Sequence, residues 1–135
     1  MKFFALVFLG SGLGGMLRYG IGRAVTVFSA SGLLPGFPWG TLVVNISGSF
    51  VMGVLAALFM YGKMTAGLSD GLLQDIRLFL LTGILGGYTT FSAFSLDAVA
   101  LWENGDTVHA LAYVLASVVF SLAALACGLA VVRSL

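Results

Sequence analysis

A single hydrophobic stretch at residues 75–102 constrains this chain more than any other feature. It reads D-IRLFLLTGIL-GGYTT-FSAFSLDAVAL-W. As one continuous helix it would measure about 42 Å, whereas a bilayer core is only about 30 Å thick. Its centre, 86–90, contains poor helix formers, the two glycines above all. Irregular backbone at membrane depth is tolerated only where protein buries it or where it lines a wet cavity. The stretch therefore predicts two half-helices that meet at a break, and ions commonly bind at such breaks.

The composition indicates an integral membrane protein. Hydrophobic residues make up 60% of the chain and charged residues 8%, whereas soluble domains carry about 25% charged residues. The net charge of +1 excludes the electrostatic footprint of a nucleic-acid-binding protein. The 135 residues leave room for about four spans of ~20 residues, so we expect one membrane domain over 1–135. The lone Cys127 forms no intrachain disulfide and is expected to pack in an apolar run.

We expect an all-α protein of four transmembrane helices with short loops, which leaves no space for a soluble enzyme site. The expected spans are 3–28, 39–61, 75–102 and 108–132, joined by loops at 29–38, 62–74 and 103–107. The basic residues Lys2, Lys63, Arg77 and Arg133 share one side, against Arg23 and at most Arg18 on the other. This is a mild positive-inside bias, and it is compatible with insertion in both orientations.

Small residues predict close contacts between helices. The chain has 19 glycines, and small residues four apart let helices approach closely in lipid. Such pairs are Gly10 and Gly14, Ser49 and Gly53, and Gly83 and Gly87. The contacts are expected within or between subunits. Because four helices of this size hardly enclose a pore alone, a homo-oligomer is expected.

Polar side chains within the spans indicate a hydrogen-bonding track. Asn45 lies in the second span with Thr41 one turn before it, and Tyr113, Ser117 and Ser121 recur every four residues on the fourth. The alternative is that the serine hydroxyls bond back to the carbonyl of residue i−4. Three hydroxyls in register, with an amide available from another helix, favour a track of neutral donors.

The break is flanked by two phenylalanines and has two electrically different ends. Phe91 and Phe94 share a helix face, and their positive ring edges could contact an anion, although ordinary packing is the alternative. Carbonyls at the end of the first half-helix could coordinate a cation, whereas amides at the start of the second suit an anion. These features do not identify which ion binds. Peripheral Arg18 and Asp97 could attract ions or simply snorkel or pair, and His109 lacks the partners of a metal site or a catalytic triad.

Three segments resemble a known family. GGMLRY at 14–19, GTLVVNISGSF at 40–50 and GGYTTFSAFSLD at 86–97 are similar to the signatures of the small fluoride channels, the Fluc or CrcB family. The similarity covers nearly the whole chain, in order and with similar spacing.

This resemblance implies a passive, fluoride-selective channel in the inner (plasma) membrane that exports fluoride. It also implies an antiparallel, dual-topology homodimer with two pores and a structural sodium ion at the centre, held by the carbonyls of Gly86 and Thr89. It places the following residues along the fluoride pathway: Asn45, Phe91, Phe94, Tyr113, Ser117, Ser121, Thr41 and Asp97, with Arg18 at the pore entrance. The implied partners are fluoride, lipid and a second copy of the chain.

The chain departs from the family pattern at two positions. Ala93 replaces a threonine, which removes a hydroxyl, and Asp97 stands where glutamate is common, which shortens the side chain.

Three other classes of protein remain as rivals. A proton-coupled exporter needs a carboxylate embedded in the membrane, an assembly subunit would not explain the aligned hydroxyls, and an enzyme would need a nucleophile–base pair.

Overall fold

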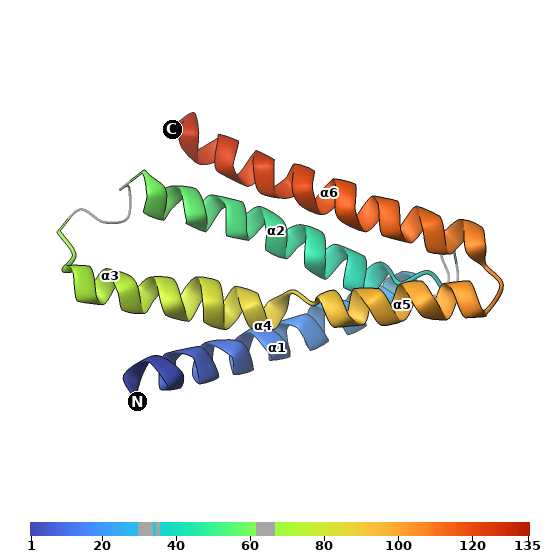
Figure 1. The fold of residues 1–135 in the computed structure, drawn as a ribbon, viewed down its shortest axis with the longest axis horizontal. Coiled ribbons are helices and arrows are strands. Elements are labelled where there is room, and N and C mark those ends of the chain that lie inside the picture. Colours follow the sequence, from blue (N-terminus) through green and yellow to red (C-terminus); the bar gives the residue numbers. More distant parts are fainter. Residues whose placement is uncertain (30–33, 35, 62–66) are drawn as a thin grey trace.

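The computed structural model describes residues 1–29, 34, 36–61 and 67–135. Within these residues the structure is helical, without strands. Four of its helical segments are long and apolar enough to cross a membrane: Lys2–Ser29, Trp39–Met60, Asp70–Glu103 and Thr107–Arg133. The prediction of four spans is therefore confirmed. Both chain termini lie at the same end of the bundle (Figure 1).

The third span is a series of helical segments rather than one regular helix. It consists of α3 (Asp70–Arg77), a π-helical stretch η1 (Leu78–Leu85), α4 (Gly86–Tyr88) and α5 (Phe91–Glu103). It starts earlier than predicted, because Ser69 caps the helix by accepting a hydrogen bond from the Leu72 amide. Residues 70–74 of the predicted loop at 62–74 are therefore helical, whereas Lys63 lies outside the described residues.

The break itself is confirmed, but it is shorter than predicted and lies further along the chain. Gly86, Gly87 and Tyr88 are helical, and only Thr89 and Thr90 adopt extended conformations. The expectation that the two glycines interrupt the helix was therefore wrong. Glycine weakens a helix by about 1 kcal/mol, and a close helix contact at this position can offset that cost.

The glycines pack α1 (Lys2–Ser29) against the third span. A Cβ on Gly14 would lie 2.0 Å from the Ile84 carbonyl oxygen, and one on Gly87 would lie 2.5 Å from the Ser11 carbonyl oxygen. A Cβ on Gly10 would lie 2.8 Å from the Gly83 Cα. No side chain fits in these contacts, so the predicted close approach of small residues occurs within the chain.

A second glycine contact joins α2 (Trp39–Met60) to α6 (Thr107–Arg133), which run side by side (Figure 1). A Cβ on Gly53 would lie 2.2 Å from the Leu125 carbonyl oxygen, and one on Gly128 would lie 2.3 Å from the Phe50 carbonyl oxygen. The small core between α2 and the third span contains Val44, Leu85 and Tyr88. The two glycine contacts thus fix the helices around the break.

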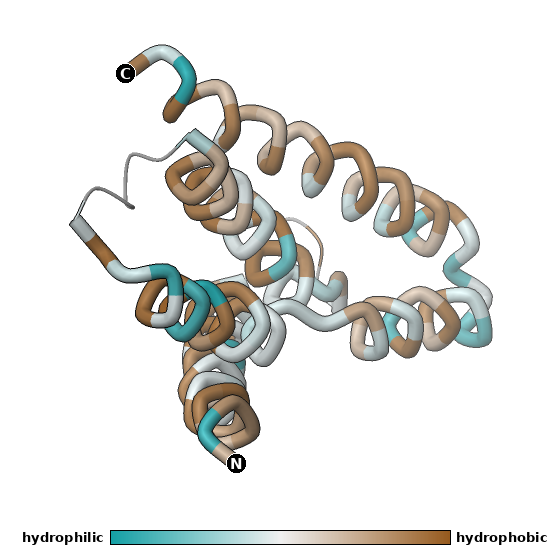
Figure 2. The backbone as a smooth tube through the Cα atoms, turned by 60° about the vertical axis from the view of Figure 1, so that its left-hand side comes forward, coloured by the Kyte–Doolittle hydropathy of each residue, from teal (hydrophilic) through white to brown (hydrophobic). Residues whose placement is uncertain are grey.

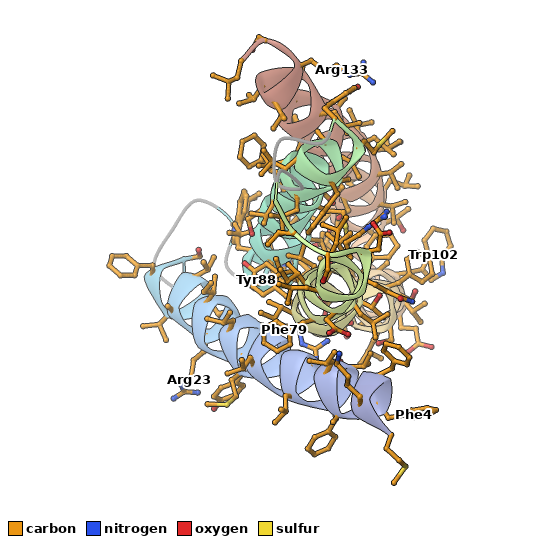
Figure 3. The ribbon with its side chains drawn as sticks, turned by 90° about the vertical axis from the view of Figure 1, so that its left-hand side faces the viewer. Phe4, Arg23, Phe79, Tyr88, Trp102 and Arg133 are labelled. Carbon is orange, nitrogen blue, oxygen red and sulfur yellow. The ribbon has the colours of Figure 1, made fainter. Side chains whose placement is uncertain are left out.

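Hydrophobic residues make up most of each long helix, and most of the strongly hydrophilic residues lie towards the helix ends (Figure 2). Many large hydrophobic side chains are exposed on the single chain, so its outer surface is largely apolar. Phe4 and Trp102 point outwards, whereas Tyr88 lies inside (Figure 3). The end that carries both termini is held by an ion pair between Lys2 and Asp75. Such a surface is suited to lipid or to another apolar protein surface.

We predict that Gly14→Ala destabilises the protein, because the new methyl group would overlap the Ile84 carbonyl. Overpacking of this kind typically costs about 1–3 kcal/mol. The measurement is the thermal unfolding midpoint of purified protein in detergent. Gly15→Ala is the matched control, because nothing beyond the neighbouring backbone of its own helix lies within 4 Å of its new Cβ. Equal unfolding midpoints for the two variants would contradict this account of α1 packing.

Candidate functional site

The break has a defined local structure. Thr90 adopts an extended conformation and caps α5, because its hydroxyl accepts a hydrogen bond of 3.1 Å from the Ala93 amide. The Thr89 hydroxyl donates back to the Leu85 carbonyl at 3.0 Å. Threonine is suited to this position, because it tolerates extended backbone and its hydroxyl can satisfy a helix end.

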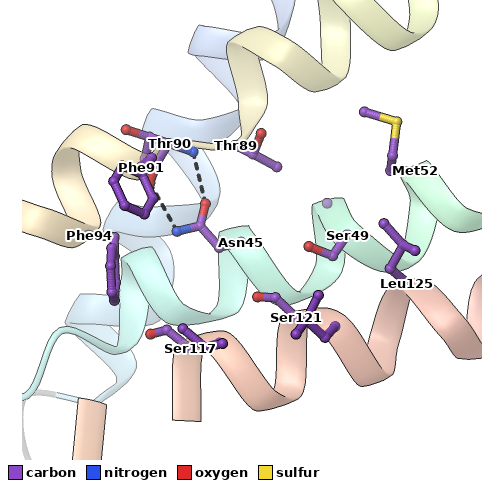
Figure 4. Close-up of a pocket in the computed structure, with 13 residues that line it drawn as sticks. Asn45, Ser49, Met52, Thr89, Thr90, Phe91, Phe94, Ser117, Ser121 and Leu125 are labelled. Carbon is purple, nitrogen blue, oxygen red and sulfur yellow. Dashed lines mark hydrogen bonds between the residues drawn. The ribbon is translucent and has the colours of Figure 1, made fainter. Parts of the chain in front are cut away.

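The side chain of Asn45, in α2, forms hydrogen bonds with the backbone of Thr90 at the break. Its Nδ2 donates to the Thr90 carbonyl at 3.0 Å, and its Oδ1 accepts from the Thr90 amide at 2.8 Å (Figure 4). The side-chain amide therefore pairs with the N–H and C=O groups of Thr90, as the backbone of a neighbouring strand would. One N–H of Asn45 is engaged in this way, and its second N–H is left over for another acceptor.

A second connection from α2 involves a residue that the sequence analysis missed. The hydroxyl groups of Ser47 and Tyr88 share a hydrogen bond of 2.8 Å. Gly48 follows Ser47, and a Cβ there would lie 2.4 Å from Thr89 Cγ2. The only signal in the sequence was the run of small residues after Asn45, which allows α2 to approach the break.

A groove with a volume of about 370 Å³ lies beside the break. It brings together five residues predicted for the pathway, from α2, α5 and α6, as Figure 4 shows: Asn45, Phe91, Phe94, Ser117 and Ser121. The remaining lining residues are Gly48, Ser49, Met52, Thr89, Thr90, Val118, Leu122 and Leu125. None of these described lining residues has a charged side chain, so the polar surface of the groove is made of neutral hydroxyl and amide groups.

Ser117 differs from an ordinary serine in a membrane helix. It is only 6% exposed, and its hydroxyl oxygen has no hydrogen-bond partner within normal geometry. A serine in a helix usually bonds back to the carbonyl four residues earlier, as Ser95 does with Phe91 at 2.9 Å. The buried Ser117 hydroxyl therefore lies beside the groove without a hydrogen bond of normal geometry, and its neighbour is the Tyr113 hydroxyl.

The third member of the hydroxyl stripe lies away from the groove. Tyr113 is fully buried, and its hydroxyl donates to Asp97 Oδ2 over 3.3 Å. The Tyr113 ring lies 5.5 Å from that of Phe94, which in turn lies 5.3 Å from that of Phe91. Tyr113 is thus connected to the groove through Phe94 and through its interaction with Ser117.

Arg18, Thr41 and Asp97 border two other hollows. Arg18 and Thr41 line one of about 480 Å³, together with Thr90 and Ala93. Thr41 and Asp97 line another of about 410 Å³ near the end of α1. The Thr90 backbone thus lies between the groove and the Arg18 hollow, and the structure does not gather all the predicted residues in one cavity.

The residues predicted to hold a cation through their carbonyls lie on either side of Tyr88. Gly86 is exposed, and a Cβ there would have only one atom within 4 Å, the Leu81 carbonyl oxygen at 3.8 Å. Thr89 is partly buried and extended. Among the described residues, no group of three or more His, Cys, Asp or Glu side chains could hold a metal ion.

We predict that Asn45→Asp destabilises the protein, because an ionised carboxylate cannot donate to the Thr90 carbonyl and leaves that carbonyl unpaired. An unsatisfied buried polar group costs about 1–3 kcal/mol. The unfolding midpoint in detergent checks this. Ser121→Ala, which changes another residue of the groove, should leave the midpoint nearly unchanged. An unchanged midpoint in Asn45→Asp would show that the break does not depend on this pairing.

Comparison with known proteins gives a consistent family assignment. Residues 5–129 match the family described as CrcB-like protein, Camphor Resistance (CrcB). A protein of Rhizobium meliloti (strain 1021) is 49% identical over 135 residues, which cover 100% of this chain and 99% of that protein. A protein of Paracoccus denitrificans (strain Pd 1222) is 51% identical over 132 residues, covering 98% and 95%. Both relatives are named fluoride-specific ion channel FluC. With four spans, a broken third span and a match over nearly its whole length, this chain belongs to the CrcB family.

Proposed function

We propose that this protein is a passive fluoride channel of the plasma membrane, a multi-pass transporter rather than an enzyme. The observation that carries the proposal is the buried, unpaired Ser117 hydroxyl in a groove lined by neutral groups. The names of the relatives and the family membership support fluoride as the ion.

A small anion that enters this groove must exchange water for protein donors. Removing a polar or charged group from water is costly unless hydrogen bonds replace those that are lost. Ser117, Ser121 and the second N–H of Asn45 are the donors available along the groove. Because these donors are neutral, they can stabilise an anion without holding it as tightly as a fixed positive charge would.

The phenylalanines supply the opposite wall of the pathway. Phe91 and Phe94 line the groove with their rings inclined at 42°. Their ring edges carry partial positive charge, so they can contact an anion without the desolvation cost of a buried cation. Phe91 is 79% exposed in the single chain, which leaves this wall of the groove open on one side.

A second copy of the chain would close the groove. We propose an antiparallel, dual-topology homodimer, in which two identical grooves form two pores. The open groove, the apolar outer surface and the weak charge bias of the sequence support this arrangement. Two grooves related by a twofold axis are the natural result of an interface between identical surfaces.

A structural sodium ion is proposed at the centre of this dimer. The carbonyls of Gly86 and Thr89 from both copies would supply four oxygen ligands, which suit a hard cation. The open surroundings of Gly86 and the extended backbone at Thr89 fit such a site. The ion would offset the cost of burying unpaired carbonyls and is not expected to be transported.

A proton-coupled exporter is less well supported. Such a protein needs a membrane carboxylate that exchanges protons along the transport route. Asp97 is the carboxylate among the predicted pathway residues, but it accepts a hydrogen bond from Tyr113 and does not line the groove.

The proposal is tested by fluoride efflux from liposomes that contain the purified protein. We expect rapid fluoride efflux and no comparable chloride efflux. Ser117→Ala should slow fluoride efflux roughly tenfold or more, since a lost hydrogen bond to a charged partner costs about 1.5 kcal/mol or more. Its unfolding midpoint should not fall, because the Ser117 hydroxyl makes no hydrogen bond in the folded chain.

Ser134→Ala is the control for this variant, because Ser134 lies at the C-terminus and its hydroxyl donates to the Val131 carbonyl. It should carry fluoride at the rate of the unmodified protein. Absent fluoride efflux in the unmodified protein would refute the channel. Normal efflux in Ser117→Ala would refute the role of the hydroxyl.

The sodium site predicts a dependence of dimer stability on sodium. Protein purified throughout with choline in place of sodium should dissociate or unfold at a lower temperature, because the facing carbonyls would lack a cation. Size-exclusion chromatography and thermal unfolding at matched ionic strength measure this. Identical dimers and midpoints in both media would contradict a structural sodium ion.

A further inference from the structure

A continuous row of aromatic rings connects one end of the bundle to the groove. Phe37, in the segment before α2, lies 6.2 Å from the His109 ring and 5.6 Å from the Tyr113 ring, edge-on to both. Tyr113 packs against Phe94, and Phe94 packs against Phe91. The row therefore ends at the two phenylalanines that line the groove.

The backbone around Phe37 is unusually constrained. Gly36 has a φ of +84°, a conformation that other residues rarely adopt. Pro38 restricts Phe37 to extended conformations. The Phe37 amide donates to the Leu34 carbonyl at 3.2 Å, and the Trp39 amide donates to the Phe37 carbonyl at 2.8 Å. These constraints fix the backbone at Phe37, and the contacts with His109 and Tyr113 place its ring against α6.

The His109 ring, which Phe37 contacts, is also held in position. His109 Nδ1 lies 2.6 Å from Asp106 Oδ2, and Asp106 also caps α6 by accepting from the His109 amide. The hydrogen bond with His109 lowers the pKa of Asp106, so this carboxyl stays ionised at neutral pH. The imidazole is thereby oriented and gives Phe37 a fixed surface to pack against.

We infer that Phe37 is a positioning residue for the channel: it fixes the Tyr113 ring and, through it, the orientation of Phe94 in the groove. This inference rests on the proposed function. Phe37 does not line the groove itself, so its effect on an ion would be indirect.

The contacts of Tyr113 explain why Phe37 matters. Tyr113 is fully buried, and its hydroxyl interacts with the side chains of Asp97, Thr41 and Ser117, whereas its ring packs against Phe94 and the edge-on ring of Phe37. A 3.3 Å hydrogen bond fixes the hydroxyl but leaves rotation of the ring about its long axis free. The edge of Phe37, at 87° to the Tyr113 ring, blocks that rotation.

The test compares Phe37→Leu with Phe37→Tyr. Leucine keeps an apolar side chain but removes the ring. Tyrosine keeps the ring and adds a hydroxyl to a side chain that borders cavities of about 410 and 180 Å³. We expect Phe37→Leu to slow fluoride efflux roughly three- to tenfold. Phe37→Tyr should retain efflux within a factor of about two. Equal slowing in both variants would overturn the inference, since it would show that the ring itself is not what matters.

Phe28→Leu is the matched control, because it removes a ring that is 89% exposed near the same end of the bundle. It should leave efflux unchanged. If Phe28→Leu slows efflux as much as Phe37→Leu does, loss of any ring at this end accounts for the effect and the inference fails.

A second readout does not depend on transport. 4-Fluorophenylalanine placed at position 94 reports the surroundings of that ring through its ¹⁹F chemical shift. Phe37→Leu should move or broaden this signal, whereas Phe37→Tyr and Phe28→Leu should not. An unchanged signal in Phe37→Leu would overturn the inference even if efflux falls. A shifted signal in a protein without fluoride efflux would support the positioning role while refuting the proposed function.

Discussion

The pairing between the Asn45 side chain and the Thr90 peptide is the interaction on which the site depends. A helix break inside a membrane leaves backbone groups without their usual partners, and lipid offers none. Asn45 provides both a donor and an acceptor at the spacing that a peptide requires. Ser47, about half a turn further along α2, adds a hydrogen bond to Tyr88. The break is therefore a stable structure with its own hydrogen bonds, and the groove beside it keeps its shape.

This pairing requires α2 and the third span to lie very close together. Gly48 allows that approach, since even a methyl group there would overlap Thr89. Gly14 and Gly87 do the same between α1 and the third span, and Gly53 and Gly128 do so between α2 and α6. The many glycines thus allow polar groups to lie around a short break. Where two helix backbones touch directly, the position of one helix along the other is fixed to within a fraction of a turn.

Much of the fold could be predicted from the sequence, because bilayer thickness limits span length and the hydrophobic runs have clear ends. The existence of the break followed from the overlong span. Its position did not, because local propensity disfavours Gly86 and Gly87 in a helix, and only the packing against α1 shows why they are helical. The periodicity of α6 grouped Tyr113 with Ser117 and Ser121, but spacing along one helix does not reveal that Tyr113 turns to Asp97 on α5. The role of Phe37 could not be recognised, because its contacts with His109 and Tyr113 join residues more than 70 positions apart in the sequence.

The two departures from the family pattern affect the site differently. At position 93 the structure uses the backbone amide, which donates to Thr90, so the missing hydroxyl leaves the helix cap intact. Ala93 does line the Arg18 hollow, and there the hydroxyl is absent from the wall. At position 97 the side-chain length matters directly, because the short Asp97 reaches Tyr113 only through a long hydrogen bond. Because this bond does not restrain rotation of the ring about its long axis, the orientation of the Tyr113 ring depends on its aromatic neighbours. In this chain, the shorter carboxylate and the fixed ring of Phe37 are therefore two parts of one arrangement that sets the position of Phe94.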